Sequence, residues 1–208
     1  DLFFVGGAMR SSDSKASSGF IHGFRYNIRT LHHLLEERYE GVEYPRTVLD
    51  PFDWDAFVDW MYNRFSVGDS IFQLYGVLCD AVVFDADGKR AEILEELPLS
   101  LAMERDFGGR HVLLLTLEFG FHHFKEPSTT FFGPSDPTNT DCAAFLHPVV
   151  RHLHGGEVSE FHFGDSLLAR WDRPHGSGGA VMSYHYKFQQ WAVERLGLAV
   201  ELPAAVAG

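Results

Sequence analysis

Hydrophobic residues recur at helical spacing near the beginning of the chain. Between residues 18 and 40 they are separated by three, four, three and four positions: Ile21, Phe24, Ile28, Leu31 and Leu35. This repeat places them along one face of an α-helix. Gly41 and Pro45 follow, and both residue types are common just after helix ends. The pattern therefore predicts a helix over 18–40, preceded by a small, polar loop over 8–18.

A short apolar segment precedes that loop. Residues 2–7 read Leu-Phe-Phe-Val-Gly-Gly, which predicts a buried strand that ends at two glycines. A domain seldom begins in the middle of a buried strand. We therefore expect the chain to be truncated, with its first strand belonging to a sheet that starts upstream of Asp1.

A second amphipathic segment covers residues 53–65. Its apolar residues share one helical face: Trp54, Phe57, Val58, Met61 and Phe65. Asp53 is a suitable N-cap, because its carboxylate can accept a hydrogen bond from an amide of the first turn. Pro45 and Pro51 bracket an extended stretch before this helix, which predicts a boundary there. We accordingly divide the chain into residues 1–45 and residues 46–208.

The pattern after residue 77 is richer in strands. It first predicts a hairpin of 77–84 with 90–97 around Asp87-Gly88, followed by a short helix over 98–107 and a strand over 111–119. A long loop over 125–141 comes next, and then a hairpin of 147–154 with 157–163 across Gly155-Gly156. The last predicted element is a helix over 183–197 that ends at Gly197. The expected fold class is α+β: the terminal strand and helix of a nucleotide-binding domain, followed by a mixed α+β C-terminal domain.

Composition excludes several classes of partner. Seventeen basic and 29 acidic residues give a net charge of −12, which disfavours nucleic acid as a partner. No apolar run approaches the roughly 18 residues of a membrane-spanning helix, so we expect no membrane partner. The two cysteines cannot form a disulfide framework and suit a reducing compartment. The 19 phenylalanines indicate aromatic-rich packing.

The predicted strand, loop and helix over 2–40 carry the strongest candidate chemistry. Glycines at a strand end allow close approach of a ligand, and the start of a helix presents unpaired N–H groups with a positive dipole end. Ser17, Ser18 and Gly19 lie where those donors are expected, next to an anionic oxygen of phosphate or reduced flavin. The same arrangement also occurs as plain architecture in many α/β proteins.

Residue identities add to this pattern. Phe4-Val5-Gly6-Gly7, followed by residues 15–26 with the octet Gly-Phe-Ile-His-Gly-Phe-Arg-Tyr over 19–26, resembles the FAD-dependent oxidoreductase domain-containing protein 2 group. These flavoproteins are related to flavin monooxygenases, and one member is found in the endoplasmic reticulum. The likeness continues more loosely after residue 70, at residues 74–80, 145–149 and 167–171.

The resemblance implies a cofactor and a set of residues that contact it. Eight positions would face FAD: Gly6, Gly7, Ser17, Ser18, Gly19, Phe20, Ile21 and His22. The intact protein would use NAD(P)H to reduce FAD and would act on a small-molecule substrate in a monooxygenase-like reaction. Ala8 and Met9 stand where many relatives have an aspartate that contacts the ribityl chain, which puts that contact in doubt.

The sequence contains no G-x-G-x-x-G after a strand, so neither the FAD pyrophosphate site nor an NAD(P)H site is complete. The missing N-terminal half of the same chain would supply them. Residues 46–208 would then form a cap or substrate-side domain. The alternative is a protein-interaction module that recruits a partner to the flavoprotein, and the position of loop 125–141 would distinguish the two. A bacterial cytoplasm is the expected location, with the endoplasmic reticulum lumen as the alternative.

Other candidate sites are weaker. His152 and His154 would share one face of a strand, but they lack further ligands at a familiar zinc spacing, and we expect no metal. Asp85-Ala86-Asp87-Gly88 resembles the start of a calcium loop, but its glycine comes too early, and a hairpin turn explains it better. Cys142 with His147 could form a nucleophile and base, although packing or surface roles are commoner. The sequence assigns no catalytic residue.

Overall fold

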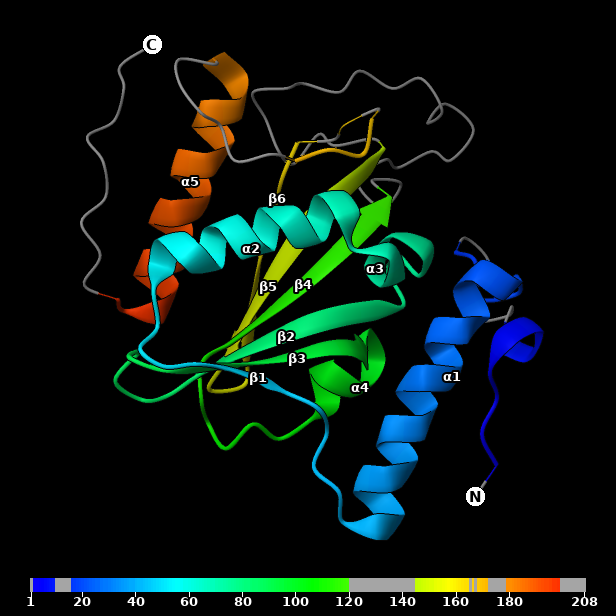
Figure 1. Ribbon diagram of the computed structural model, residues 1–208. Coiled ribbons are helices and arrows are strands. Elements are labelled where there is room, and N and C mark those ends of the chain that lie inside the picture. The colour runs from blue at the N-terminus through cyan, green and yellow to red at the C-terminus, as the bar shows by residue number, and fades with distance from the viewer. Residues whose placement is uncertain are drawn as a thin grey trace.

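The computed structural model describes residues 2–9, 16–119, 145–164, 166, 168–171 and 179–198. Its centre is a six-stranded antiparallel sheet with the order β1-β3-β2-β4-β5-β6. Helix α2 crosses one face of the sheet, and α1 lies on the side of the molecule opposite α5 (Figure 1). The α+β class expected from the sequence is confirmed.

Most predicted elements are present. The strands are β1 Thr47–Leu49, β2 Leu78–Phe84, β3 Ala91–Pro98, β4 Val112–Phe119, β5 Leu146–His154 and β6 Glu157–His162. The helices are α1 Ile21–Leu35, α2 Trp54–Val67, α3 Asp69–Gln73, α4 Leu99–Glu104 and α5 Gly179–Leu196. Both predicted hairpins, across Asp87-Gly88 and across Gly155-Gly156, are confirmed. The short helix α3 and strand β1 were not predicted, because each is too brief to show a periodic pattern.

The main core lies between the sheet and helices α2 and α5. The predicted apolar face of α2 is buried, and it meets Val82 of β2, Leu115 of β4 and Phe188 of α5. Phe57, Phe163 and Phe188 contact other aromatic rings at centroid distances between 5.1 and 6.4 Å. Much of the phenylalanine content is therefore packing, as expected. A smaller core on the opposite face joins Val83 and Leu114 to Tyr44.

Helix α1 is confirmed, but it packs through a different face from its apolar one. The helix continues into a π-helical turn, Glu36–Glu40, and ends at Gly41, whose φ of 68° is left-handed. Its buried residues are Gly23, Tyr26, Asn27 and Thr30. Ile21 and Ile28 of the apolar face are exposed. The buried face combines an apolar contact of Tyr26 with Leu74 and Leu78 and the polar contact of Thr30 with Glu96 of β3.

The predicted strand over residues 2–7 is wrong. Residues 2–5 have no regular structure, and Gly6–Met9 form a 3₁₀ turn. A strand requires a hydrogen-bonded neighbour, and among the described residues the sheet contains only β1 to β6. The segment instead runs beside α1 (Figure 1). Leu2 and Phe4 are 78% and 62% exposed there, so a buried position is not available to them.

Two further expectations fall on residues outside the described part of the chain. They concern the long loop over 125–141 and Cys142.

The N-cap of α2 gives a direct test of the local sequence signals. The Asp53 carboxylate accepts a hydrogen bond from the Ala56 amide at 2.9 Å. Asp53→Ala should lower the free energy of unfolding by about 1 kcal/mol, because the amide loses its acceptor. Urea denaturation measures this. Asp53→Asn is the matched control, since asparagine caps helices equally well; equal losses for both variants would show that the cap contributes nothing.

Candidate functional site

The predicted flavin-facing residues lie around the beginning of α1. Gly6, with φ +65°, and Ser18 are buried against the helix. A Cβ atom added at Gly6 would lie 3.4 Å from Cβ of Phe24 and 3.7 Å from the Ser18 carbonyl oxygen. The fold thus brings Gly6 and the serine turn together. Ser17 is half-buried, whereas Gly7 and residues 19–22 are exposed.

A close backbone contact fixes the turn before α1. A Cβ atom on Gly23 would lie only 2.0 Å from the carbonyl oxygen of Ser17, so any larger residue would displace the turn. The Ser17 carbonyl also accepts from the Phe20 amide at 2.9 Å, and the Ser17 amide donates to the Gln73 carbonyl of α3 at 2.9 Å. The start of α1 is therefore held at a defined position against the rest of the molecule.

The surface around this turn is apolar and exposed. Leu2, Phe4, Phe20 and Ile21 are all more than half exposed, and Ile21 reaches 75%. Phe20 stacks on His22 with ring centroids 5.6 Å apart. The N-cap residue Phe20 provides no side-chain hydrogen bond, so the first amides of the helix are not satisfied by a side-chain cap. This combination offers hydrogen-bond donors within an apolar surface.

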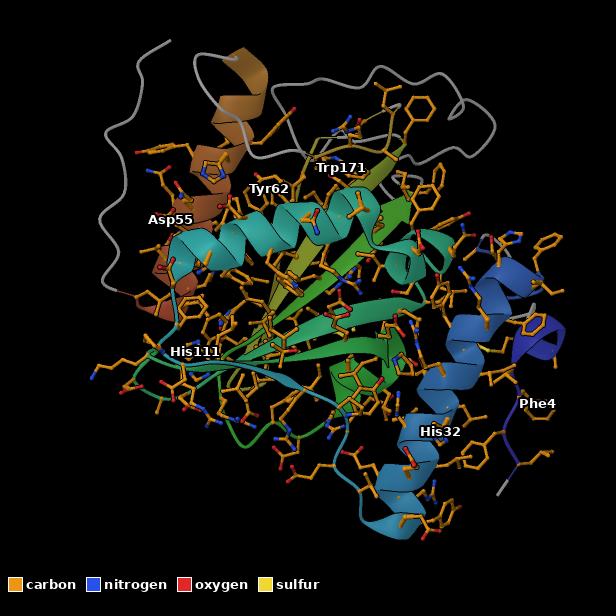
Figure 2. The ribbon with its side chains drawn as sticks, viewed as in Figure 1. Phe4, His32, Asp55, Tyr62, His111 and Trp171 are labelled. Atoms are coloured by element: carbon orange, nitrogen blue, oxygen red, sulfur yellow. The ribbon has the colours of Figure 1, made fainter. Side chains whose placement is uncertain are left out.

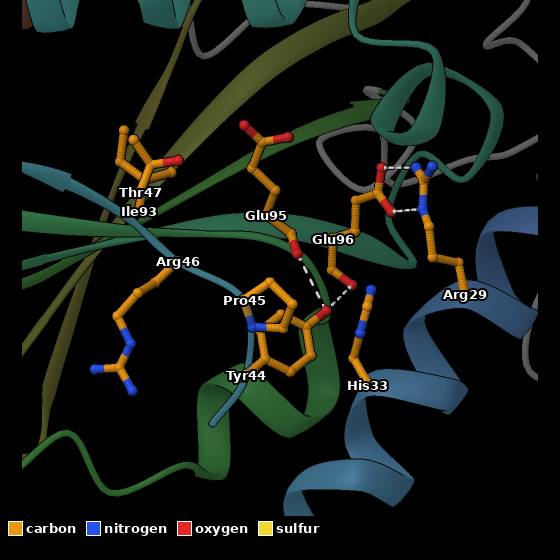
Figure 3. Close-up of a pocket in the computed structure, with 9 residues that line it drawn as sticks. All are labelled: Arg29, His33, Tyr44, Pro45, Arg46, Thr47, Ile93, Glu95 and Glu96. Atoms are coloured by element: carbon orange, nitrogen blue, oxygen red, sulfur yellow. Dashed lines mark hydrogen bonds and ion pairs between the residues drawn. The ribbon is translucent and has the colours of Figure 1, made fainter. Parts of the chain in front are cut away.

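A polar pocket of about 360 Å³ opens on the other side of α1, where the helix meets β3 (Figure 3). Nine residues line it: Arg29, His33, Tyr44, Pro45, Arg46, Thr47, Ile93, Glu95 and Glu96. The Tyr44 hydroxyl lies 3.1 Å from the Glu95 carbonyl oxygen and 3.2 Å from that of Glu96. Burial is the main cause that raises the pKa values of both the Tyr44 phenol and the Glu95 carboxyl.

Glu96 connects the pocket to α1. Its φ of 64° is left-handed, a conformation that is rare for residues other than glycine. The Glu96 carboxylate pairs with the Arg29 guanidinium, and the Thr30 hydroxyl donates to the Glu96 carbonyl at 2.9 Å. Strained residues of this kind persist only when their surroundings hold them. The contacts that hold Glu96 also attach α1 to the sheet.

A buried ion pair lies beneath Glu96. Asp80 of β2 has no exposed surface, and its carboxylate accepts from Arg64 of α2 at 2.7 and 3.0 Å. One Asp80 oxygen also accepts from the Glu96 amide at 2.9 Å. The pairing between β2 and β3 shifts register between Cys79 and Ala81, so Asp80 lies at a bulge. A charged residue within an apolar strand is the one sequence signal for this network, and none of the predicted site residues belongs to it.

Histidines form two clusters on the sheet. Nδ1 of His111 lies 2.9 Å from Nε2 of His152, and the rings of His111 and His154 stack at 3.7 Å. In the second cluster, His147 bridges the Phe145 carbonyl and His162 at 2.9 and 3.1 Å. Both nitrogens of His147 are thus engaged, while Cys142, its partner in the predicted pair, lies outside the described residues. Burial raises the pKa of the Cys79 thiol, so this cysteine is not an activated nucleophile.

Comparison with known proteins gives two significant relatives. The chain is 32% identical over 202 residues to a zebrafish (Danio rerio) protein named FAD-dependent oxidoreductase domain-containing protein 2. It is 27% identical over 201 residues to the mouse (Mus musculus) protein of the same name. Each match covers 84% of this chain but only 28% and 30% of the relative. The chain therefore spans less than a third of the curated relatives that it matches.

No protein-family model matches the chain, and no solved structure matches it significantly. Among the residues that the structure describes, none of the helices combines the length and the apolar character required to cross a membrane.

The buried pair of Asp80 and Arg64 yields a stability prediction. Asp80→Asn or Arg64→Met should each lower the free energy of unfolding by about 3–5 kcal/mol, because each leaves an uncompensated buried group. The double variant should lose less than the sum of the two. Urea denaturation measures all three. Lys89→Met, which breaks the exposed pair with Asp87, is the control and should cost less than about 1 kcal/mol; additive losses would refute the coupling.

His152 yields a pH prediction. Burial, followed by the neighbouring charges of His111, His154 and Arg195, lowers its pKa from 6.5 to about 4. As the pH falls, His152 is protonated at a higher pH in the unfolded chain than in the folded one. The folded state should therefore lose stability as the pH falls from 6.5 toward 4. His152→Gln should show a smaller loss over that interval in thermal melts. The exposed His22→Gln should behave as the parent, and an unchanged slope for His152→Gln would contradict the assignment.

Proposed function

Since this chain belongs to the FAD-dependent oxidoreductase domain-containing protein 2 family, we propose that it forms part of an FAD-dependent oxidoreductase and that the beginning of α1 faces the flavin. The proposal is carried by one observation. Residues 19–22, the first half of the octet that carries the resemblance, lie exposed at a helix start inside an apolar surface that the described part of the chain leaves open.

The residues present fit a flavin. The amides of Ile21 and His22 begin the helix and have no partner within it, so they can donate to an anionic oxygen. A Cβ atom on Gly7 would meet nothing within 4 Å, which leaves room for a flat ring system to approach. Phe4, Phe20 and Ile21 supply apolar surface that excludes water.

The chain's own contribution is binding and orientation. FAD supplies the redox chemistry when it is bound. The helix dipole favours negative charge at the pyrimidine end of the ring, and the contact between Gly23 and Ser17 keeps the turn at one distance from it. Arg25 donates to the Tyr26 hydroxyl at 2.7 Å and lies over that ring, so its guanidinium is held beside Tyr26.

The proposal extends to the rest of the FAD site, the reductant and the substrate. The adenine and pyrophosphate of FAD would bind to a part of the protein that precedes these residues, and so would NAD(P)H as the reductant. The sheet domain would cover the substrate side of a monooxygenase-like reaction on a small molecule. These assignments are supported by the resemblance and by the absence of a G-x-G-x-x-G in the sequence.

The first test follows from the proposal that these residues hold only part of the FAD site. The 208-residue chain alone should bind FAD weakly or not at all, because a helix start contributes only about 0.3–1 kcal/mol and cannot offset the cost of ordering a large ligand. The product of the full reading frame should purify yellow. Flavin absorbance after desalting measures both. Stoichiometric FAD in the short chain would show that the site is complete within these residues.

The role of the helix start gives a second, sharper test within the full-length protein. His22→Asp adds a carboxylate in the first turn of α1, where it suits the helix dipole and should not destabilise the fold. It should nevertheless weaken FAD binding by about two- to five-fold through repulsion, equivalent to the ~0.3–1 kcal/mol of the dipole interaction. Tyr39→Asp, at the far end of the same helix, is the matched control. Equal affinities for parent and His22→Asp would place the flavin elsewhere.

A further inference from the structure

Three side chains of the types that bind metal ions lie together near the end of helix α1. His32, His33 and Glu36 lie where the α-helix passes into the π-helical turn at Glu36–Glu40. Each offers one ligand atom, and these three atoms lie within 4.8 Å of one another. His32 projects from the exposed side of the helix (Figure 2). Turns of this type are frequent at functional sites.

The separations between these atoms suit a shared ion. Nε2 of His32 lies 3.3 Å from Oε2 of Glu36, and Nδ1 of His33 lies 3.6 Å from the same oxygen. Zinc binds nitrogen and oxygen at about 2.0–2.2 Å in tetrahedral geometry, which sets ligand atoms roughly 3.3–3.6 Å apart. The free structure thus already holds two of the three ligand pairs at the distances that a bound ion would impose.

A second, independent observation concerns Nδ1 of His33. Its Nδ1 atom is covered by the protein and makes no hydrogen bond. Buried polar nitrogens nearly always have a partner, and the Glu36 oxygen at 3.6 Å is too distant to be one. The ring is fixed by an edge contact with Tyr44 at 5.7 Å between centroids. An ion between His33 and Glu36 would satisfy this nitrogen without moving the ring.

We propose that His32, His33 and Glu36 form a binding site for a divalent transition-metal ion, with zinc as the expected occupant. Imidazole and carboxylate ligands suit this class of ion. Three protein ligands leave at least one coordination position open. Because His33 also lines the pocket between α1 and β3, that open position lies at the rim of the pocket, beside Arg29 and Tyr44. The site does not depend on the flavin.

The test is a calorimetric titration of zinc into the metal-stripped 208-residue chain. One saturable event with a stoichiometry of one is expected. Glu36→Gln and His32→Ala should each reduce the affinity by more than the ~10–100-fold that loss of an outer-shell partner causes. His32 is exposed, so its substitution should not affect folding, and circular dichroism of each variant confirms this. Cobalt in place of zinc should give visible bands that report the coordination number.

Two further variants locate the site. His22→Ala, on the same helix, and His154→Ala, in the separate histidine cluster of the sheet, should both retain the affinity of the parent. Absence of a saturable event would overturn the proposal, as would parent affinity in Glu36→Gln and His32→Ala. Loss of binding in His154→Ala would also overturn it, because the ion would then lie on the sheet.

Discussion

The attachment of α1 to β3 depends on one buried carboxylate. Asp80 neutralises Arg64 from α2 and at the same time accepts from the Glu96 amide. This bond holds β3 in its left-handed bend, which turns the Glu96 carboxylate toward Arg29 of α1. A charge without exposed surface is costly unless it is fully paired, so the arrangement has little freedom to relax. This chain of contacts joins the middle of α1 and the pocket to the sheet, while the Ser17–Gln73 bond holds the helix start against α3.

Much of the sheet and its helices could be predicted from the sequence, because the signals there are local. The turn residues Asp87-Gly88 and Gly155-Gly156 fix two hairpins, and the Asp53 cap with its apolar repeat defines α2. Gly41 and Gly197 end helices with left-handed φ values, as their positions indicated. In each case the residues that determine the element lie within about ten positions of one another, where periodicity and turn chemistry are informative.

The remaining features depend on contacts between distant residues. Periodicity showed that α1 is a helix, but the face that packs is the one that meets residues distant in the sequence: Tyr26 meets Leu74 and Leu78, and Thr30 bonds to Glu96. Residues 2–5 read as a strand because their composition is apolar, yet strand formation requires a neighbour that composition does not reveal. The octet over 19–26 pointed to the beginning of α1. Asp80 gave only the signal of a charge within an apolar strand, and Glu96 and the group at His32 gave no usable pattern.

The polar attachment of α1 has a consequence for how the molecule loosens. The sheet is held by two apolar cores, whereas α1 is attached through a small apolar cluster that joins Tyr26 to Leu74 and Leu78 and through the polar contacts of Arg29 and Thr30 with Glu96. Regions with few apolar contacts open at lower free energy than the global transition. The helix is therefore expected to open more readily than the sheet, and its detachment should depend in part on ionic strength, because ion pairs are screened by salt. In that case α1 would leave its place while the sheet stays folded.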